Sequence, residues 1–112
     1  MAPSAAFLDF ACELFSGIGQ VSARRMFGGA GLYAEGMMFA LIADDVIYLK
    51  ADPALAAALE AEGCGPFIYD GGKSGKAHQM NYWRLPDAAL DDPEIAESWG
   101  RRALDVARAA KR

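Results

Sequence analysis

The sequence predicts an α+β fold in which three helices pack against an antiparallel five-stranded sheet, in the order α-β-β-β-α-β-β-α. Three observations lead to this prediction. Short apolar runs separated by two-residue turn signals follow one another from residue 31 to residue 50. Apolar residues recur at helical spacing near both ends of the chain. Two helical segments are preceded by helix-start pairs, Asp52-Pro53 and Asp92-Pro93.

The first helix is expected to start after Ser4, whose side chain can cap free amides, and to end at Gly17 or Gly19. Its apolar stripe is Phe7, Ala11, Leu14, Phe15 and Ile18. Residues 20–23 are expected to form a linker. The segment that follows is a glycine-rich elbow made of Arg24, Arg25, Met26, Phe27, Gly28 and Gly29.

Three strands are predicted next, at residues 31–34, 37–43 and 46–50. Glu35-Gly36 and Asp44-Asp45 are the expected turns between them. The middle segment reads MMFALIA and is apolar on both alternating faces. We therefore expect it to be the central strand, covered on two sides.

The second helix is expected to begin at Pro53, with Leu55 and Leu59 on one face. Strands are predicted at residues 66–70 and 79–85, flanking a loop at residues 71–75. The last helix is expected from Pro93, with acidic residues at its start and basic residues near its end. This order suits the helix dipole. A nucleic-acid patch at the basic end is the alternative interpretation.

Length and composition indicate one domain spanning residues 1–112, because 54% of the residues are hydrophobic and 23% are charged. The formal charge of −4 and the isoelectric point near 4.8 oppose strong binding to nucleic acid. No apolar run approaches the roughly 18 residues of a membrane span. The N-terminal segment lacks the basic region of a signal peptide, so a cytoplasmic location is expected.

Two glycine-rich segments resemble nucleotide-binding motifs but have the wrong spacing. A phosphate-binding loop ending in Gly72-Lys73-Ser74 needs a glycine at position 67, which holds Phe67. The run from Gly28 to Gly31 precedes a strand and has alanine at position 34, so it does not fit a dinucleotide fingerprint. We expect no bound cofactor, and we interpret both segments as turns or loops.

Potential catalytic and metal-binding residues are few. Cys12 and Cys64 lack zinc-site spacing and are expected to be buried thiols. His78 is the one histidine, and no nucleophile or acid is placed around it by the sequence. No catalytic or metal residue is predicted, and a partly exposed structural role is expected for His78.

Arg24 and Arg25 are the residues that most invite a functional reading. The planar guanidinium group suits recognition of a carboxylate or phosphate on a partner. An internal salt bridge to one of the 15 acidic residues is the alternative, and the sequence leaves both open.

Several segments together resemble one known family. They are Arg24-Arg25-Met26-Phe27-Gly28-Gly29, Gly31-Leu32-Tyr33, Met38-Phe39-Ala40-Leu41-Ile42-Ala43, Tyr48-Leu49-Lys50, Tyr82-Trp83-Arg84-Leu85-Pro86 and Asp91-Asp92-Pro93-Glu94. In these segments the chain is similar to the N-terminal domain of the TfoX (Sxy) family, in a stand-alone form without the C-terminal helical domain of full-length members. The resemblance implies an α+β fold of three helices and five strands. It also implies a role like that of regulators of natural competence, which act with the cyclic-AMP receptor protein.

The resemblance supplies no catalytic residues, so a non-catalytic regulatory or adaptor domain that acts through protein–protein contacts is our main hypothesis. Transcription machinery is the candidate partner, and direct DNA binding is not expected. The candidate partner surface comprises the family's signature positions Arg24, Arg25, Phe27, Gly28 and Gly29. One alternative is a small-molecule-binding protein or enzyme with a pocket between sheet and helices, lined by Tyr33, Tyr48, Tyr82 or Trp83. Another is a structural homodimer joined through sheet edges or the last helix.

Overall fold

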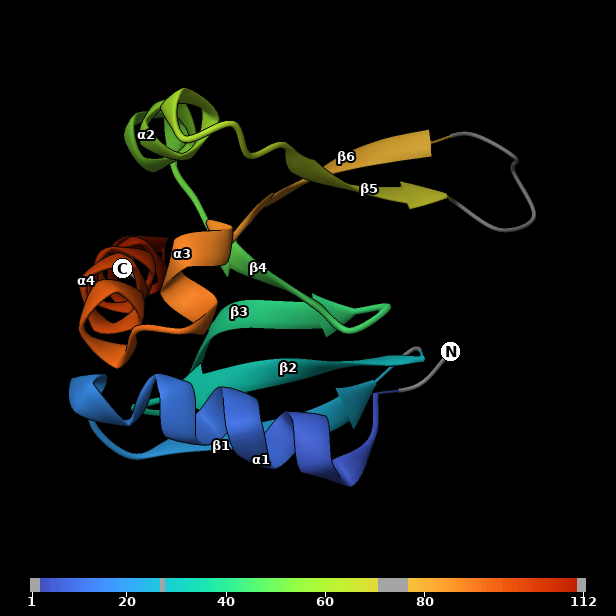
Figure 1. Cartoon of the computed structure of the whole chain (residues 1–112). Helices are drawn as coiled ribbons and strands as arrows, with labels where there is room; N and C mark the ends of the chain where they lie inside the picture. Colours follow the sequence, from blue (N-terminus) through green and yellow to red (C-terminus); the bar gives the residue numbers. More distant parts are fainter. Residues whose placement is uncertain (1–2, 27, 71–76, 111–112) are drawn as a thin grey trace.

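The computed structural model describes residues 3–26, 28–70 and 77–110, with the backbone alone at 69–70 and 77–80. It is an α+β structure with a single antiparallel sheet (Figure 1). The strands are β1 (Val21–Met26), β2 (Gly29–Ala34), β3 (Met37–Ala43), β4 (Val46–Lys50), β5 (Pro66–Asp70) and β6 (Ala77–Arg84). The helices are α1 (Ala5–Leu14), α2 (Pro53–Ala61), α3 (Asp87–Leu90) and α4 (Pro93–Ala110), with a 3₁₀ turn at Ser16–Ile18.

Two counts differ from the sequence-based prediction. The sheet has six strands instead of five, because the expected linker and elbow form strand β1. Its sequence, VSARRM, has no continuous apolar run, and its apolar positions alternate with serine and arginine. The described residues also contain four α-helices instead of three, because the four-residue α3 is too short to show a helical period.

The sheet order is β1-β2-β3-β4-β6-β5, so β3 and β4 lie in its interior. The predicted turns are confirmed: Glu35, Gly36, Asp44 and Asp45 all have positive φ, as tight hairpins between twisted strands require. A register shift between β2 and β3 pairs Leu32 with Ala40 and Tyr33 with Met38. Phe39 is thereby left as an extra residue, and both Phe39 and Ala40 are fully buried.

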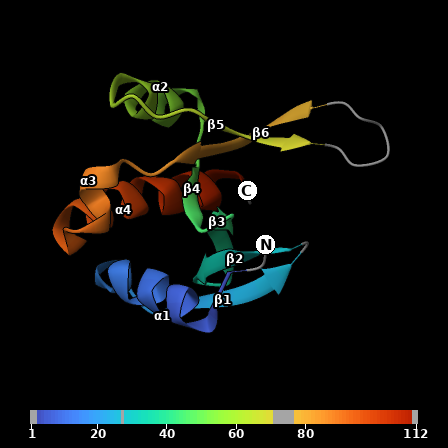
Figure 2. The same cartoon turned by 45° about the vertical axis from the view of Figure 1, so that its right-hand side comes forward.

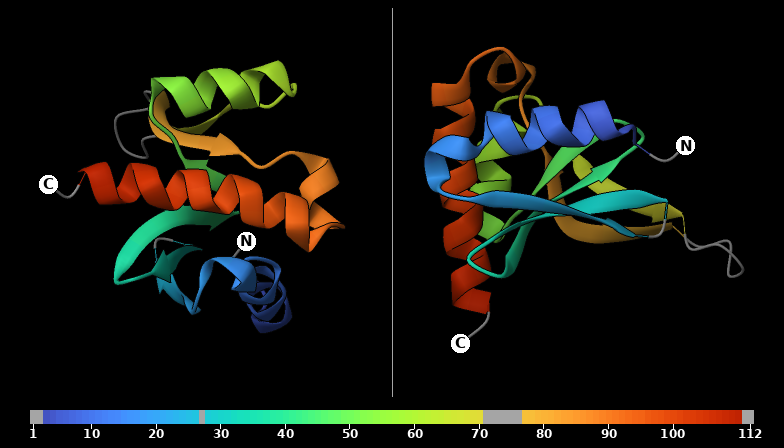
Figure 3. Two further views of the ribbon diagram at one scale, coloured as in Figure 1. Left: turned by 90° about the vertical axis from the view of Figure 1, so that its left-hand side faces the viewer. Right: turned by 90° about the horizontal axis from the view of Figure 1, so that it is seen from below.

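The helices lie on one side of the sheet. Helix α4 runs beside β3 and β4, and α1 runs beside β1 (Figure 2). Seen from the left of Figure 1, α2 and α4 stand in front of the strands, and α1 is seen nearly end-on beside β1 (Figure 3). The prediction of a central strand at 37–43 is therefore right, but the expectation that it is covered on two sides is wrong, because no described helix covers its second face.

The core fills the space between these helices and the inward face of the sheet. Phe15, after α1, meets Phe39 edge-on, with ring centroids 5.4 Å apart. The remaining buried apolar residues belong to the same cluster, including Leu32, Ile42 and Leu49 of the sheet and Leu104 of α4. Both predicted Asp-Pro helix starts are confirmed, and Asp52 accepts a 2.8 Å hydrogen bond from the amide of Leu55. Within the described residues, no helix is both long enough and apolar enough to cross a membrane.

Candidate interaction surface

Strand β1 places the two signature arginines on opposite faces of the sheet. Side chains alternate along a strand, so neighbouring residues cannot share a face. Arg25 is paired with the core residue Ala30, and its Nη1 donates a 2.7 Å hydrogen bond to the carbonyl oxygen of Pro3. Arg24 is paired with Gly31, and its guanidinium carbon lies 4.8 Å from the centre of the Tyr33 ring. Arg25 therefore holds the N-terminal segment, while Arg24 belongs to the other face.

We call the other face of the sheet the open face. Its positions follow from the register: Gly31 pairs with Leu41, Leu41 with Tyr48, and Lys50 with Tyr82. Phe67 of β5 joins it through a ring contact with Tyr48 at 4.9 Å. The open face includes Arg24, Met26, Tyr33, Met38, Leu41, Tyr48, Lys50, Phe67, Tyr82 and Arg84, the register partner of Tyr48. Apart from the exposed Arg24 and Arg84, these side chains are partly buried, and the apolar ones do not belong to the set that packs against the core.

Gly31 lets the side chains of this face converge. A Cβ atom at this position would lie 2.6 Å from the sulfur of Met38 and 3.1 Å from both Met26 Cε and Tyr33 Cε1. The absence of a side chain here makes room for two methionines and a tyrosine over the backbone of β2. The sequence-based interpretation counted Gly31 both in a turn-forming run and as the first residue of a strand. The structure places it inside β2, where it serves packing.

Tyr82 is a partly buried member of the open face. Burial raises the pKa of its hydroxyl, and Tyr33 on the same face raises it further. Both effects keep Tyr82 neutral at physiological pH.

The charge on the open face differs in sign from that of the whole chain. The side chains named above include three cations and no carboxylate: Arg24, Lys50 and Arg84, the last of which forms an ion pair with Asp87. The chain as a whole carries a formal charge of −4. The open face thus combines aromatic and methionine side chains with local positive charge.

The expected aromatic pocket between sheet and helices is not formed. Tyr33, Tyr48 and Tyr82 lie on the open face, whereas Trp83, the next residue along β6, points to the helix side and packs against the core. The reason is again the alternation of side chains along a strand. Two hollows in the described surface, of about 350 and 300 Å³, are lined by none of these four aromatic residues.

The remaining residues singled out in the sequence are dispersed. Gly28, with φ of +79°, lies in the β1–β2 turn. Gly29 begins β2, and a Cβ atom at this position would collide with the carbonyl oxygen of Ile42. Phe27, the predicted loop at residues 71–75 and the side chain of His78 lie outside the described residues. Sequence reasoning missed Met26, Met38 and Leu41, whose common face becomes visible only once the strand register is known.

The cysteines lie apart from this surface. Cys12 is on α1 and Cys64 follows α2, and neither forms a disulfide. Burial raises the pKa of both thiols, so both stay protonated and weakly reactive near neutral pH. Among the described residues, no three His, Cys, Asp or Glu side chains gather as metal ligands would.

Comparison with known families identifies the domain. A profile of the TfoX N-terminal domain matches residues 13–107. The chain belongs to the TfoX N-terminal domain family. The match includes all six strands and most of α4, so every residue of the open face lies inside the TfoX domain.

One curated relative carries the family name. The chain is 38% identical over 91 residues to the DNA transformation protein TfoX1 of Aliivibrio fischeri. The matched segment covers 81% of this chain and 43% of the relative, so this chain spans less than half of the relative's length. The first family signature, Arg24 to Gly29, forms the end of β1 and the turn into β2 of the TfoX domain.

Proposed function

We propose that this TfoX domain is a non-catalytic regulatory domain that binds a protein partner through its open face. The observation that supports the proposal most is the composition of that face. Tyrosine, methionine and arginine are enriched in protein–protein interfaces, and residues of these types here lie on a sheet face that no described helix covers. The similarity to a DNA transformation protein supports a regulatory role connected with competence.

A protein partner fits the electrostatics better than DNA does. Binding to a nucleic-acid backbone requires many neutralised phosphates, and the open face offers only three described cations, one of them paired with Asp87, on a chain with a net charge of −4. Arg24 and Lys50 beside aromatic rings suit a partner segment that carries acidic and apolar side chains. We place this interaction in the cytoplasm, with a component of the transcription machinery as the candidate partner.

The two adjacent arginines provide a matched test. Arg24→Glu reverses a charge on the open face, and Arg25→Glu makes the same change on the helix side. Affinity capture from native lysate with mass spectrometry should recover a partner with the wild-type chain and with folded Arg25→Glu, but not with folded Arg24→Glu. Equal recovery by both variants would show that binding does not use the open face.

A second arm tests the DNA alternative. Titration of the purified chain against promoter DNA at physiological salt should show no binding, because few phosphates can be neutralised. Tight, salt-resistant binding that is lost in Arg24→Glu would replace the protein-binding proposal with a nucleic-acid one.

A further inference from the structure

A groove lies between α1, α3 and the start of β4, with the buried Ile47 and Leu85 at its base. It has a volume of about 350 Å³. Its lining combines apolar side chains (Phe7, Phe10, Val46, Ile47, Leu85 and Leu90) with charged ones (Asp45, Arg84, Asp87 and Asp91). We call it the acidic groove.

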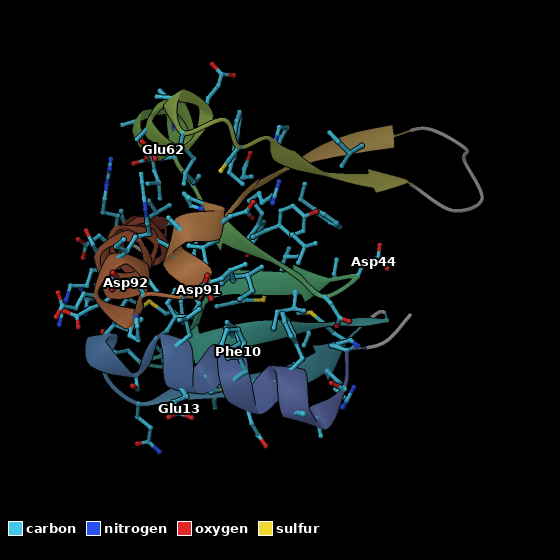
Figure 4. The ribbon with its side chains drawn as sticks, in the orientation of Figure 1. Phe10, Glu13, Asp44, Glu62, Asp91 and Asp92 are labelled. Atoms are coloured by element: carbon cyan, nitrogen blue, oxygen red, sulfur yellow. The ribbon has the colours of Figure 1, made fainter. Side chains whose placement is uncertain are left out.

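Phe10 is a large apolar side chain of α1 that remains exposed to solvent. Phe7 and Leu8 of the same helix pack against the core, whereas Phe10 does not and is 40% exposed. Its ring contacts Phe7, with centroids 5.8 Å apart. Figure 4 shows Phe10 on the side of α1 that faces α3, with Asp91 at the neighbouring end of α3. The exposed ring therefore forms one wall of the groove instead of sealing it.

The floor of the groove is apolar and fixed. Ile47 and Leu85 are 2% exposed, and the amide of Leu85 donates a 2.9 Å hydrogen bond to the carbonyl oxygen of Ile47. This bond joins the start of β4 to the segment that leads into α3. A side chain that enters the groove thus meets a preformed apolar surface, which favours binding because little has to be reordered.

The rim of the groove is negative. Arg84 forms an ion pair with Asp87, so the positive charge of the only described cation in the lining is balanced within it. Asp45 and Asp91 add two further negative charges. Three carboxylates and one guanidinium give the groove a net charge of −2, which would repel an acidic segment and attract a basic one.

We propose that the acidic groove binds a cationic amphipathic helix of a partner protein. One or two large apolar side chains of that helix would occupy the space beside Phe10, and flanking Lys or Arg side chains would approach Asp45 and Asp91. The volume of the groove is at the lower end of that of known ligand sites, which suits side chains better than a whole cofactor. The groove shares Arg84 with the open face, but its other lining residues are not among those named for that face, and its net charge has the opposite sign.

The test uses two synthetic peptides and the whole chain. One peptide is an amphipathic helix of leucine and lysine, and the other has glutamate in place of lysine. Amide chemical shifts of the isotope-labelled chain should change around Phe10, Val46 and Leu90 on addition of the lysine peptide. No such change should occur with the glutamate peptide.

Three variants separate specific binding from general charge attraction. Phe10→Ala and Asp91→Lys should each weaken the affinity for the lysine peptide by about tenfold. Glu13→Lys makes the same charge change as Asp91→Lys, but Glu13 lies on α1 outside the lining of the groove. This variant should alter the affinity by less than about twofold. Arg24→Glu should also leave it unchanged, which makes this test independent of the function proposed for the open face.

Several results would overturn the proposal. These are chemical-shift changes located elsewhere, equal weakening by Glu13→Lys and Asp91→Lys, binding of the glutamate peptide in the groove, or no binding at all. Self-association of the chain that is abolished by Phe10→Ala would equally overturn it, because a second copy would then be the occupant.

Discussion

Gly100 lies on the side of α4 that faces Phe15 and Ile18, just after α1. A Cβ atom at this position would be 2.8 Å from Cδ1 of Phe15 and 3.6 Å from Cγ2 of Ile18. Phe15 is fully buried and is held against Phe39, so its ring has little room to move. The glycine is thus required by close packing, although glycine is a poor helix former.

Gly100→Ala should destabilise the domain. Overpacking lowers the free energy of unfolding by about 1–3 kcal/mol, and the higher helix propensity of alanine raises it by about 1 kcal/mol. We expect a net loss of roughly 1 kcal/mol in the free energy of unfolding, measured by urea denaturation. Ser98→Ala on the exposed side of the same helix is the control and should be near neutral. An unchanged or increased stability of Gly100→Ala would show that Phe15 can move aside.

At the scale of single residues, the sequence indicated which side chains are unusual but not which face of the sheet each of them occupies. It identified Arg24 and Arg25 as unusual but could not separate them, because a segment interpreted as an elbow has no defined alternation. Once Val21–Met26 is known to be a strand, the separation follows without further information. The contact between Arg25 and Pro3 could not be predicted, since it depends on the path of residues that precede α1.

Three of the four described α-helices, α1, α2 and α4, begin with a side-chain cap, and α3 does not. Ser4 accepts a 3.1 Å hydrogen bond from the amide of Phe7, and Asp92 accepts bonds from the amides of Glu94 and Ile95. Asp52 caps α2 in the same way. All three caps were recognisable from the sequence, because capping needs only a short polar side chain ahead of the first turn.

Asp52→Ala should therefore destabilise the domain by about 1 kcal/mol, as loss of a helix cap does elsewhere. Asp52→Asn keeps an acceptor oxygen at the same place and should cost clearly less. Thermal and urea unfolding of both variants would measure the difference. Equal losses would mean that the charge of Asp52, and not its hydrogen bond to Leu55, stabilises α2.

Among the elements, turn chemistry led to the most reliable predictions. The hairpins at Glu35-Gly36 and Asp44-Asp45 fixed three neighbouring strands in order. The pairing of β4 with β6 could not be predicted, since α2 and β5 lie between these strands in the sequence. Strand β1 was missed for lack of an apolar run, and α3 for lack of length.

At the scale of the whole molecule, one ion pair joins distant segments. Arg108, near the end of α4, donates hydrogen bonds from Nε and Nη2 to the carboxylate of Glu35 in the β2–β3 turn. It also bonds Asp105 on its own helix. The hydrogen bond to Arg108 lowers the pKa of Glu35, so the folded state favours the charged carboxylate.

This ion pair predicts a pH dependence of stability. Because the pKa of Glu35 is lower in the folded state than in the unfolded state, its stabilising effect is present above the unfolded value of 4.5 and is lost as the pH falls through the folded value. Both groups are exposed, so the effect should be small. Urea denaturation at about pH 6 should show wild type slightly more stable than Glu35→Gln, and the difference should vanish at about pH 3. A difference that persists unchanged at the acid pH would contradict the ion-pair account.

The candidate surface itself could not be read from the sequence. Its members come from β1, β2, β3, β4, β5 and β6, and they share a face only because of register and because the helices lie on the other side. In the sequence, MMFALIA suggested a strand covered on both sides. The structure leaves Met38 and Leu41 on the face that no described helix covers, and that difference led to the proposed binding surface.

Site-specific photo-crosslinking in living cells is the most direct test of whether the open face binds a protein, because it captures whichever protein touches the chosen position. A photoreactive phenylalanine derivative would replace Tyr33 or Tyr48 on the open face, and Glu13 on α1 as the control. We expect a covalent adduct with one partner protein from positions 33 and 48, and none from position 13. Adducts from position 13 alone, or from no position, would contradict the proposal that the open face binds a protein.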